Sequence, residues 1–105
     1  MWISSGRITN PTINLVLLDT GALVAKERLF QVFVSATVAV ALELQWRDAT
    51  DTTTLKSQII AVPAYAFTFM PAFVKEIPMS DNERLRIIAV AAATGSVSCS
   101  LDYTA

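Results

Sequence analysis

Apolar and polar side chains alternate strictly in the middle of the chain, where residues 42–47 read LELQWR. Successive side chains of a β-strand point to opposite faces, so one face carries two leucines and a tryptophan. The other face carries a carboxylate, an amide and a guanidinium. This pattern predicts a half-buried strand over residues 38–48, with one face on the core and one face in water. It also predicts that Trp46 is the central core residue.

Shorter β-rich or alternating runs occur along the rest of the chain, and polar or turn-forming segments separate them. The clearest breaks are DATDTTT at residues 48–54, PMSDNE at residues 78–83 and TGS at residues 94–96. The other expected strands cover residues 13–18, 29–36, 55–62, 64–70, 73–77, 85–91 and 96–103, with residues 23–25 as a short extension of the first.

A helix over residues 29–44 is the alternative to two of these strands, since alanine and leucine there suit a helix. Clustered β-branched residues and the lack of a glycine cap favour strands. Seven to eight short strands predict an all-β fold, a two-sheet antiparallel sandwich of jelly-roll or Greek-key type. Residues 13–105 form this single domain, and residues 1–12 form an N-terminal arm or edge segment.

The composition predicts a surface that is poor in charge. Charged residues make up 16% of the chain, against about 25% in ordinary domains, and the net charge is −1. Such a chain has no general attraction to nucleic acid. The apolar run at residues 32–42 is shorter than the ~20 residues of a membrane-spanning helix, and the first residues lack a signal-peptide pattern. We expect a soluble protein with no membrane or nucleic-acid partner, part of whose apolar surface another molecule covers.

The chain lacks the side chains that most enzymes use. It has no histidine and a single cysteine, Cys99, so it can form neither a Ser-His-Asp nor a Cys-His site, and no internal disulfide. Cys99 alternates with serines and shares its parity with apolar residues, which predicts a small buried side chain. None of the three glycines belongs to a phosphate-binding motif. We expect no enzymatic activity, no catalytic residue and no cofactor.

Two acidic segments have both a chemical and a plain interpretation. Asp48 and Asp51 lie among threonines and offer oxygen ligands to a hard cation, but the loop lacks the regular spacing of a calcium site. Asp81 and Glu83 form a carboxylate pair in a turn. A solvated loop, and a turn that leads into a strand with outward-facing arginines, explain both segments. No metal site is expected.

Aromatic residues gather near prolines in the second half of the chain. Some must fill the core, but prolines at both ends indicate an edge or crossing segment, which exposes part of what it carries. Another tryptophan lies in the polar N-terminal segment. The candidates for contacts with a subunit or another partner are Trp2, Tyr65, Phe67 and Phe73.

Several stretches together resemble a group of small phage virion proteins, the decoration or cement proteins that stabilise capsids. QWRD at residues 45–48 ends a strand before a threonine-rich loop, and the acidic turn DNER at residues 81–84 leads into LRI at residues 85–87. AAATG at residues 91–95 forms the next turn, and SVSCSLDY at residues 96–103 is the last strand. The resemblance covers most of the chain from Leu18 and does not extend to the N-terminal arm.

The resemblance implies a non-enzymatic β-sandwich that binds the major capsid protein as a homo-oligomer, usually a trimer. It implies a place on the capsid surface of the virion after synthesis in the host cytoplasm, and it carries over no catalytic residue. The alternative is a carbohydrate- or surface-ligand-binding module of a virion or tail. Exposed aromatic rings and the loop of aspartates and threonines suggest that alternative.

Replacing Phe73 with a charged residue tests the expected subunit contact. If Phe73 is buried between subunits, Phe73→Glu should dissociate the oligomer, because burying an unpaired charge is strongly unfavourable. Light scattering on the wild-type and variant proteins measures the change. An unchanged oligomer mass would place Phe73 outside the interface.

Overall fold

The computed structural model describes residues 2–23, 28–71 and 82–104. These residues form strands joined by turns and loops, and the predicted all-β class is confirmed. No helix occurs in the described ranges, so none there could cross a membrane. The strands are β1 (Trp2–Ser4), β2 (Ile8–Thr9), β3 (Val16–Asp19), β4 (Arg28–Ala36), β5 (Val40–Arg47), β6 (Thr54–Val62), β7 (Ala66–Pro71), β8 (Arg84–Ala89) and β9 (Ser96–Thr104).

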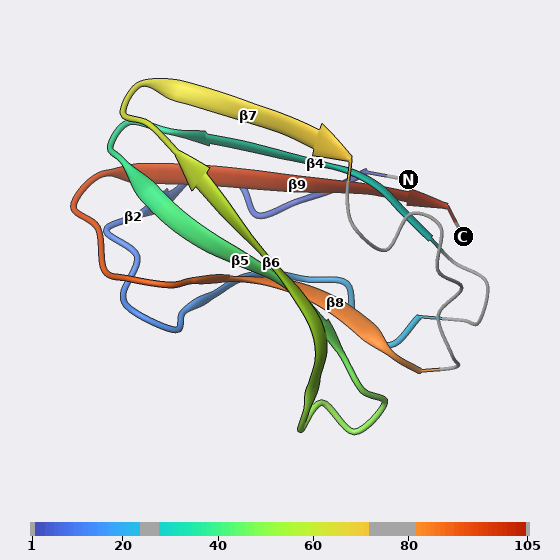
Figure 1. Cartoon of the computed structure of the whole chain (residues 1–105). Coiled ribbons are helices and arrows are strands. Elements are labelled where there is room, and N and C mark those ends of the chain that lie inside the picture. The colour runs from blue at the N-terminus through green and yellow to red at the C-terminus, as the bar shows by residue number, and fades with distance from the viewer. Residues whose placement is uncertain (1, 24–27, 72–81, 105) are drawn as a thin grey trace.

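The strands form two antiparallel sheets that stack on each other (Figure 1). In sheet A the strand order is β1-β9-β4-β7, and β2 also pairs with β9. In sheet B the strand order is β3-β8-β5-β6. The predicted two-sheet sandwich is therefore confirmed.

The strand pairing is that of a jelly roll. Both β1 and β2 pair with β9, so they act as one strand that is interrupted at residues 5–7. When that strand is counted once, the first strand pairs with the last, the second with the seventh, the third with the sixth and the fourth with the fifth. This nested pairing is one long antiparallel ribbon folded over into two sheets, which is the jelly-roll arrangement.

The region with two interpretations, residues 29–44, forms strands and not a helix. β4 belongs to sheet A and β5 to sheet B, and residues 37–39 carry the chain from one sheet to the other. β1 and β2, from the N-terminal segment, lie at the edge of sheet A. The strand expected at residues 73–77 lies outside the described residues, as do residues 24–25 of the expected short extension.

The core is a layer of aliphatic side chains between the two sheets. In β5, Leu42 and Leu44 are 1% and 0% exposed, as the alternating pattern predicts. Burying each aliphatic side chain of this size contributes roughly 1.5–3 kcal/mol. The other fully buried side chains come from both sheets: Val32, Val34, Ile60, Leu85, Ile87, Val97, Cys99 and Leu101.

Trp46 points to the predicted face of β5, but the prediction that it is the central core residue is wrong. It is partly buried and packs against the core near one end of the strand. Its Nε1 donates a hydrogen bond to the buried carboxylate of Glu83. A buried indole N–H requires a polar partner, and the aliphatic centre of the sandwich offers none. The end of β5 provides that partner, so the leucines occupy the centre.

A pair of variants tests this assignment of the core. Leu44→Ala should lower the free energy of unfolding by about 2–5 kcal/mol, because it leaves a cavity in a closed layer. Trp46→Phe keeps a ring but removes the N–H donor, and should lower it by about 1–3 kcal/mol by leaving Glu83 unpaired. Urea denaturation measures both values. If Trp46→Phe lowered the free energy of unfolding more than Leu44→Ala, the assignment of Leu44 and not Trp46 to the centre of the core would be wrong.

Candidate functional site

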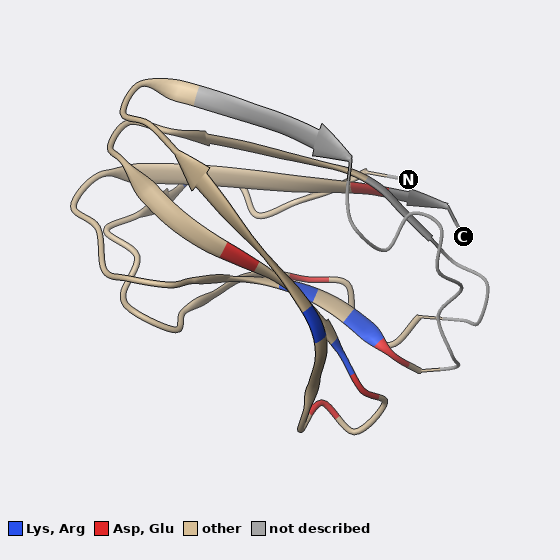
Figure 2. Ribbon diagram, in the orientation of Figure 1, with Lys and Arg blue, Asp and Glu red and all other residues tan. Residues whose placement is uncertain are grey.

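The outer face of sheet A carries hydroxyl groups and aromatic rings and few charges. In the register of β9 with β4, Ser98 lies opposite Ser35 and Ser100 opposite Phe33. These residues alternate with buried ones along both strands, so they point away from the core. Figure 2 shows charged segments mainly on β8, on β5 and in the loop after β5, and very few on the described part of sheet A.

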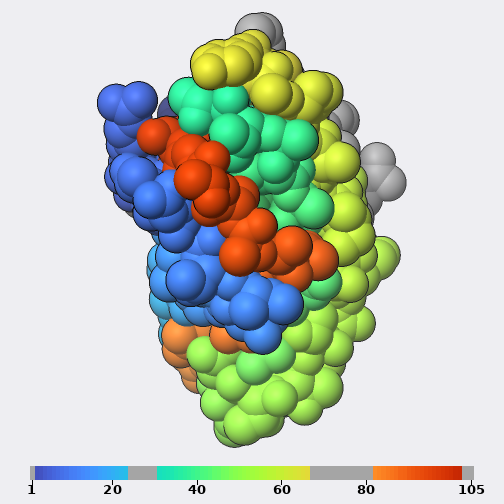
Figure 3. Space-filling model, turned by 90° about the vertical axis from the view of Figure 1, so that its left-hand side faces the viewer, coloured from blue at the N-terminus to red at the C-terminus, as the bar shows by residue number. Residues whose placement is uncertain are grey.

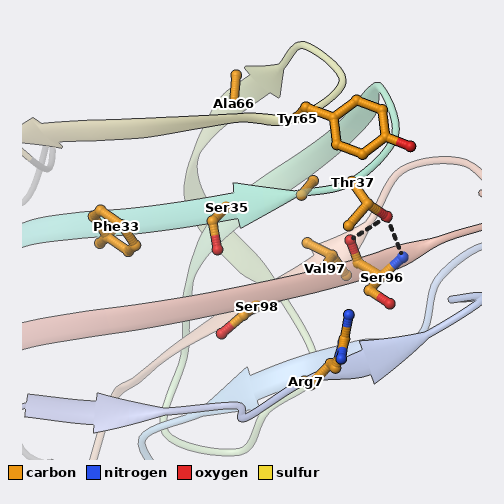
Figure 4. A pocket seen from close by; sticks show the side chains of 10 residues that line it. Arg7, Phe33, Ser35, Thr37, Tyr65, Ala66, Ser96, Val97 and Ser98 are labelled. Carbon is orange, nitrogen blue, oxygen red and sulfur yellow. Dashed lines mark hydrogen bonds between the residues drawn. The ribbon is translucent and has the colours of Figure 1, made fainter.

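A pocket of about 400 Å³ opens on this face (Figure 4). Strands β4 and β9 form its floor, and the turn before β7 and the segment between β1 and β2 form its two sides. Tyr65 and Arg7 lie on these opposite sides, with serine side chains between them. The polar and aromatic residues that line the pocket are Arg7, Phe33, Ser35, Thr37, Tyr65, Ser96 and Ser98.

A close contact between two turns fixes one end of the pocket floor. Thr37 Oγ1 accepts a hydrogen bond of 2.9 Å from the backbone N–H of Ser96. A Cβ at the preceding residue, Gly95, would lie 2.6 Å from a methyl carbon of Val38, so a side chain there would push the turns apart. Figure 3 shows this end of the sandwich, where the N-terminal segment, β9, β4 and the turn before β7 lie side by side.

Tyr65 stands at the rim of the pocket with 87% of its surface exposed. Its φ is 54°, in the left-handed region of backbone conformation. That conformation costs a residue with a side chain roughly 1–2 kcal/mol, and glycine adopts it freely. The turn therefore holds a large, exposed aromatic ring at the pocket in a strained backbone conformation.

Arg7 carries a positive charge that is not balanced locally. Arg47, Arg84 and Arg86 lie 2.9, 3.8 and 3.8 Å from carboxylate oxygens of Asp51. Within the described part of the chain, Arg7 is exposed and forms no ion pair. A guanidinium presents a planar set of donors that matches a carboxylate or phosphate. The pocket therefore offers one cationic group to an anionic ligand.

A second polar group, the arginine cluster, lies on the outer face of sheet B and consists of Arg47, Arg84, Arg86, Asp51 and Asp19. Arg47 Nε donates to Asp51 Oδ1 at 2.9 Å, and Arg84 Nη1 lies 3.5 Å from Asp19 Oδ2. The hydrogen bond from Arg47, together with the charges of the three arginines, holds the pKa of Asp51 below its ordinary value. The cluster ties the loop after β5 to the strands.

The polar face of β5 is less solvated than the alternating pattern predicts. Gln45 is 7% exposed, and its Nε2 donates a hydrogen bond of 2.6 Å to Glu43 Oε1. Gln45 Oε1 accepts a hydrogen bond of 2.6 Å from Arg86 Nε. The polar residues lie on the predicted face, but they satisfy one another and not only water.

The described acidic residues of the two candidate segments, Asp48, Asp51 and Glu83, form hydrogen bonds within the protein. The carboxylate of Asp48 accepts hydrogen bonds from the backbone N–H groups of Thr52 and Thr53, and the first of these is the main reason that its pKa is lowered. No group of three or more potential metal ligands occurs in the part of the chain that is described. Asp81 lies outside that part, and Glu83 is buried and accepts the hydrogen bond from Trp46 Nε1.

Cys99 is fully buried, which confirms its predicted role as a small core side chain. Burial raises the pKa of its thiol to about 11, although the hydroxyl of Ser5 opposes this shift. At neutral pH the sulfur is therefore protonated, and a protonated thiol is a poor nucleophile.

Two of the four aromatic residues predicted as contacts have described side chains, and both are exposed. Trp2, on β1, is 52% exposed, and Tyr65 lies at the pocket rim. The side chain of Phe67 lies outside the described part, although its backbone pairs with Ser35. Phe73 lies wholly outside the described part. Their role as contacts remains a prediction.

Most residues of the pocket cannot be predicted from the sequence, because they come from segments that are far apart in the chain. The serines of the last strand share one polar parity, but the pocket also needs Ser35, Phe33 and Arg7 from other segments. The one signal in the sequence was the regular serine alternation of residues 96–100. The pairing of β9 with β4 turns that alternation into the floor of a pocket.

The half of sheet B's outer face away from the arginine cluster is mainly apolar, with Glu43 among its residues. Across β3, β8, β5 and β6, the register aligns Val16, Ile88, Glu43 and Ile59 in one row. Val16 is 41% exposed and Ile59 is 55% exposed. We define the apolar patch as the outward-facing residues Val16, Ala41, Ile59, Ala61 and Val90.

Comparisons with known proteins add little to this description. No family model matches the chain, and no curated protein matches it. One solved structure that aligns with it is described as the structure of infectious bursal disease virus Gx strain, with a TM-score of 0.49 and 11% sequence identity. The alignment covers 98% of this chain and 31% of that chain, so this chain spans less than a third of the other's length.

Replacing Asp51 tests the arginine cluster. The folded-state pKa of Asp51 is lowered, so its contribution to stability is present above its unfolded pKa of about 3.9 and is lost as the pH falls through the folded value. Asp51→Asn should therefore melt at a lower temperature at pH 7 and lose less stability than wild type on acidification below about pH 4. Thermal melts over this pH range at low salt measure the difference. Asp102→Asn, on sheet A, is the control, and an acid response of Asp51→Asn equal to that of wild type would contradict the prediction.

Proposed function

We propose that this chain is a non-enzymatic structural protein of a virus particle. In this proposal it forms a homo-oligomer, with a trimer favoured, and binds the major capsid protein at the capsid surface. There it decorates or cements the shell of a bacteriophage, after synthesis in the host cytoplasm. The apolar patch on the outer face of sheet B is the observation that carries the proposal.

The fold is compatible with such a role but does not select it. Jelly rolls occur in viral capsid domains and also in lectins and other proteins, so architecture alone leaves function open. The resemblance of residues 45–48, 81–87 and 91–103 to phage decoration proteins supports the virion among these alternatives. The surface of the molecule supplies the further support.

The apolar patch has the composition of an interface centre. Its large side chains Val16, Ile59 and Val90 are between 36% and 55% exposed in the single chain. Glu43 is the charged residue in this half of the face, and its carboxylate is engaged by Gln45. Interface centres are depleted of charge, whereas their rims are polar. The arginine cluster next to the patch provides such a rim.

The reactive groups support the non-enzymatic part of the proposal. The thiol of Cys99 is buried and protonated at neutral pH. The carboxylates of Asp48 and Asp51 are occupied by backbone N–H groups and by arginines. A catalytic acid or nucleophile must reach a substrate, and these groups are turned to structural partners.

Two variants of the same strand separate the apolar patch from the rest of sheet B. Ile59→Lys places a charge on the exposed β6 side of the patch and should dissociate the oligomer, because a charged side chain opposes burial in an interface. Leu55→Lys is the matched control, since Leu55 lies on β6, is similarly exposed at 52%, and is outside the patch. Analytical ultracentrifugation of the full chain measures the masses.

We expect a trimer for wild type and Leu55→Lys, and a folded monomer for Ile59→Lys. Circular dichroism melts check that Ile59→Lys is folded. Immunogold electron microscopy of particles from the native source tests the place on the capsid surface. A wild-type protein that stays monomeric and is absent from purified particles would overturn the proposal.

A further inference from the structure

We infer that the pocket on the outer face of sheet A binds a sugar that bears a carboxylate group. This inference goes beyond the proposed function and does not depend on it. The pocket lies on sheet A, and the apolar patch proposed as an interface lies on the outer face of sheet B. The two proposals therefore concern opposite outer faces of the sandwich.

The charge of the pocket selects an anionic ligand. Arg7 is the charged residue among those that line it, and it has no carboxylate partner within the described part of the chain. An arginine can hold both oxygens of a carboxylate through two parallel hydrogen bonds. Among the arginines with described side chains, Arg47, Arg84 and Arg86 already lie near Asp51, so Arg7 is available to a carboxylate from outside the chain.

The remaining groups fit a sugar ring. Ser35, Ser96 and Ser98 offer hydroxyl groups, which both donate to and accept from the hydroxyls of a sugar. Phe33 and Tyr65 offer aromatic surface against which the apolar C–H face of a pyranose can pack. A fatty acid would not use the serine hydroxyls, and an inorganic anion would not use the aromatic surface.

The position of Tyr65 is the structural feature that a ligand best explains. At a turn position with φ of 54° and 87% exposure, glycine or asparagine would cause less backbone strain than tyrosine. The backbone instead places an aromatic ring across the pocket from Arg7 (Figure 4). Backbone strain of this kind is typical of ligand-binding positions. One side of the pocket thus presents a ring and the other a cation.

The size of the pocket suits a short glycan or its terminal residue. Its volume of about 400 Å³ is near the lower end of the 300–1,000 Å³ range of small-molecule sites. It is open on the outer face of the sheet, so a sugar at the end of a longer chain can enter while the rest of the chain stays in solvent. The ligand class is therefore an acidic monosaccharide unit, free or at the end of a glycan.

Matched probes test the carboxylate directly. Methyl glucuronide and methyl glucoside differ in a carboxylate against a hydroxymethyl group, and the methyl glycoside of N-acetylneuraminic acid represents the larger acidic sugars. NMR titration of the isotope-labelled full chain measures each affinity. We expect the acidic sugars to bind with a Kd of about 1 mM, as suits a ligand of this size, and methyl glucoside to bind at least about tenfold more weakly.

Three variants locate the binding. Arg7→Gln should weaken acidic-sugar binding about tenfold and leave methyl glucoside unchanged, since it removes the charged hydrogen bonds alone. Tyr65→Asn should weaken all the sugars while raising thermal stability, because asparagine tolerates the left-handed backbone. Lys56→Gln, which removes one positive charge from sheet B, is the control and should leave the binding of all the sugars unchanged.

Several results would overturn the inference. One is that no acidic sugar binds with a Kd below about 10 mM. Another is that acetate or sulfate binds Arg7 as tightly as the acidic sugars, which would make the site a simple anion site. A third is that Arg7→Gln or Tyr65→Asn abolishes self-association in ultracentrifugation, which would show that a second copy of the chain occupies the pocket. Equal binding of methyl glucuronide by wild type and Arg7→Gln would also contradict it.

Discussion

The two sheets of this protein share one layer of aliphatic side chains, and the rest of the structure depends on that layer. Each strand contributes every second side chain to it, so the same alternation decides which residues remain for the two outer faces. Leu42 and Leu44 from sheet B and Val32 and Val34 from sheet A are almost completely buried. Leucines and not Trp46 lie at the centre of this layer, because the layer contains no partner for the indole N–H.

What remains outside the layer is distributed unevenly. Sheet B carries a dense set of ion pairs at one half of its outer face and apolar side chains at the other. Sheet A carries hydroxyl groups, aromatic rings and an arginine without an acidic neighbour among the described residues. A chain with a net charge of −1 thus has three chemically different surfaces. The net charge alone conceals this segregation.

Local patterns predicted the strands well and their partners poorly. The alternation of residues 42–47 identified the faces of β5, and the serine alternation identified those of β9. The all-β class and the two-sheet sandwich followed from such runs. The pocket did not, because it depends on the nested pairing that brings Arg7, Tyr65 and Ser98 together from three distant segments. The burial of Glu83 was missed for the same reason, since Trp46 lies far away in the sequence.

Burial of the single cysteine has a consequence for the lifetime of the protein. A chain folded in a reducing compartment that later meets oxygen risks covalent cross-links between copies through any accessible sulfur. Cys99 is fully enclosed, and its sulfur is protonated at neutral pH. Oxidants and disulfides can reach the Cys99 thiol only when the sandwich opens locally. The same core that gives the protein its shape thereby makes it chemically durable in either environment.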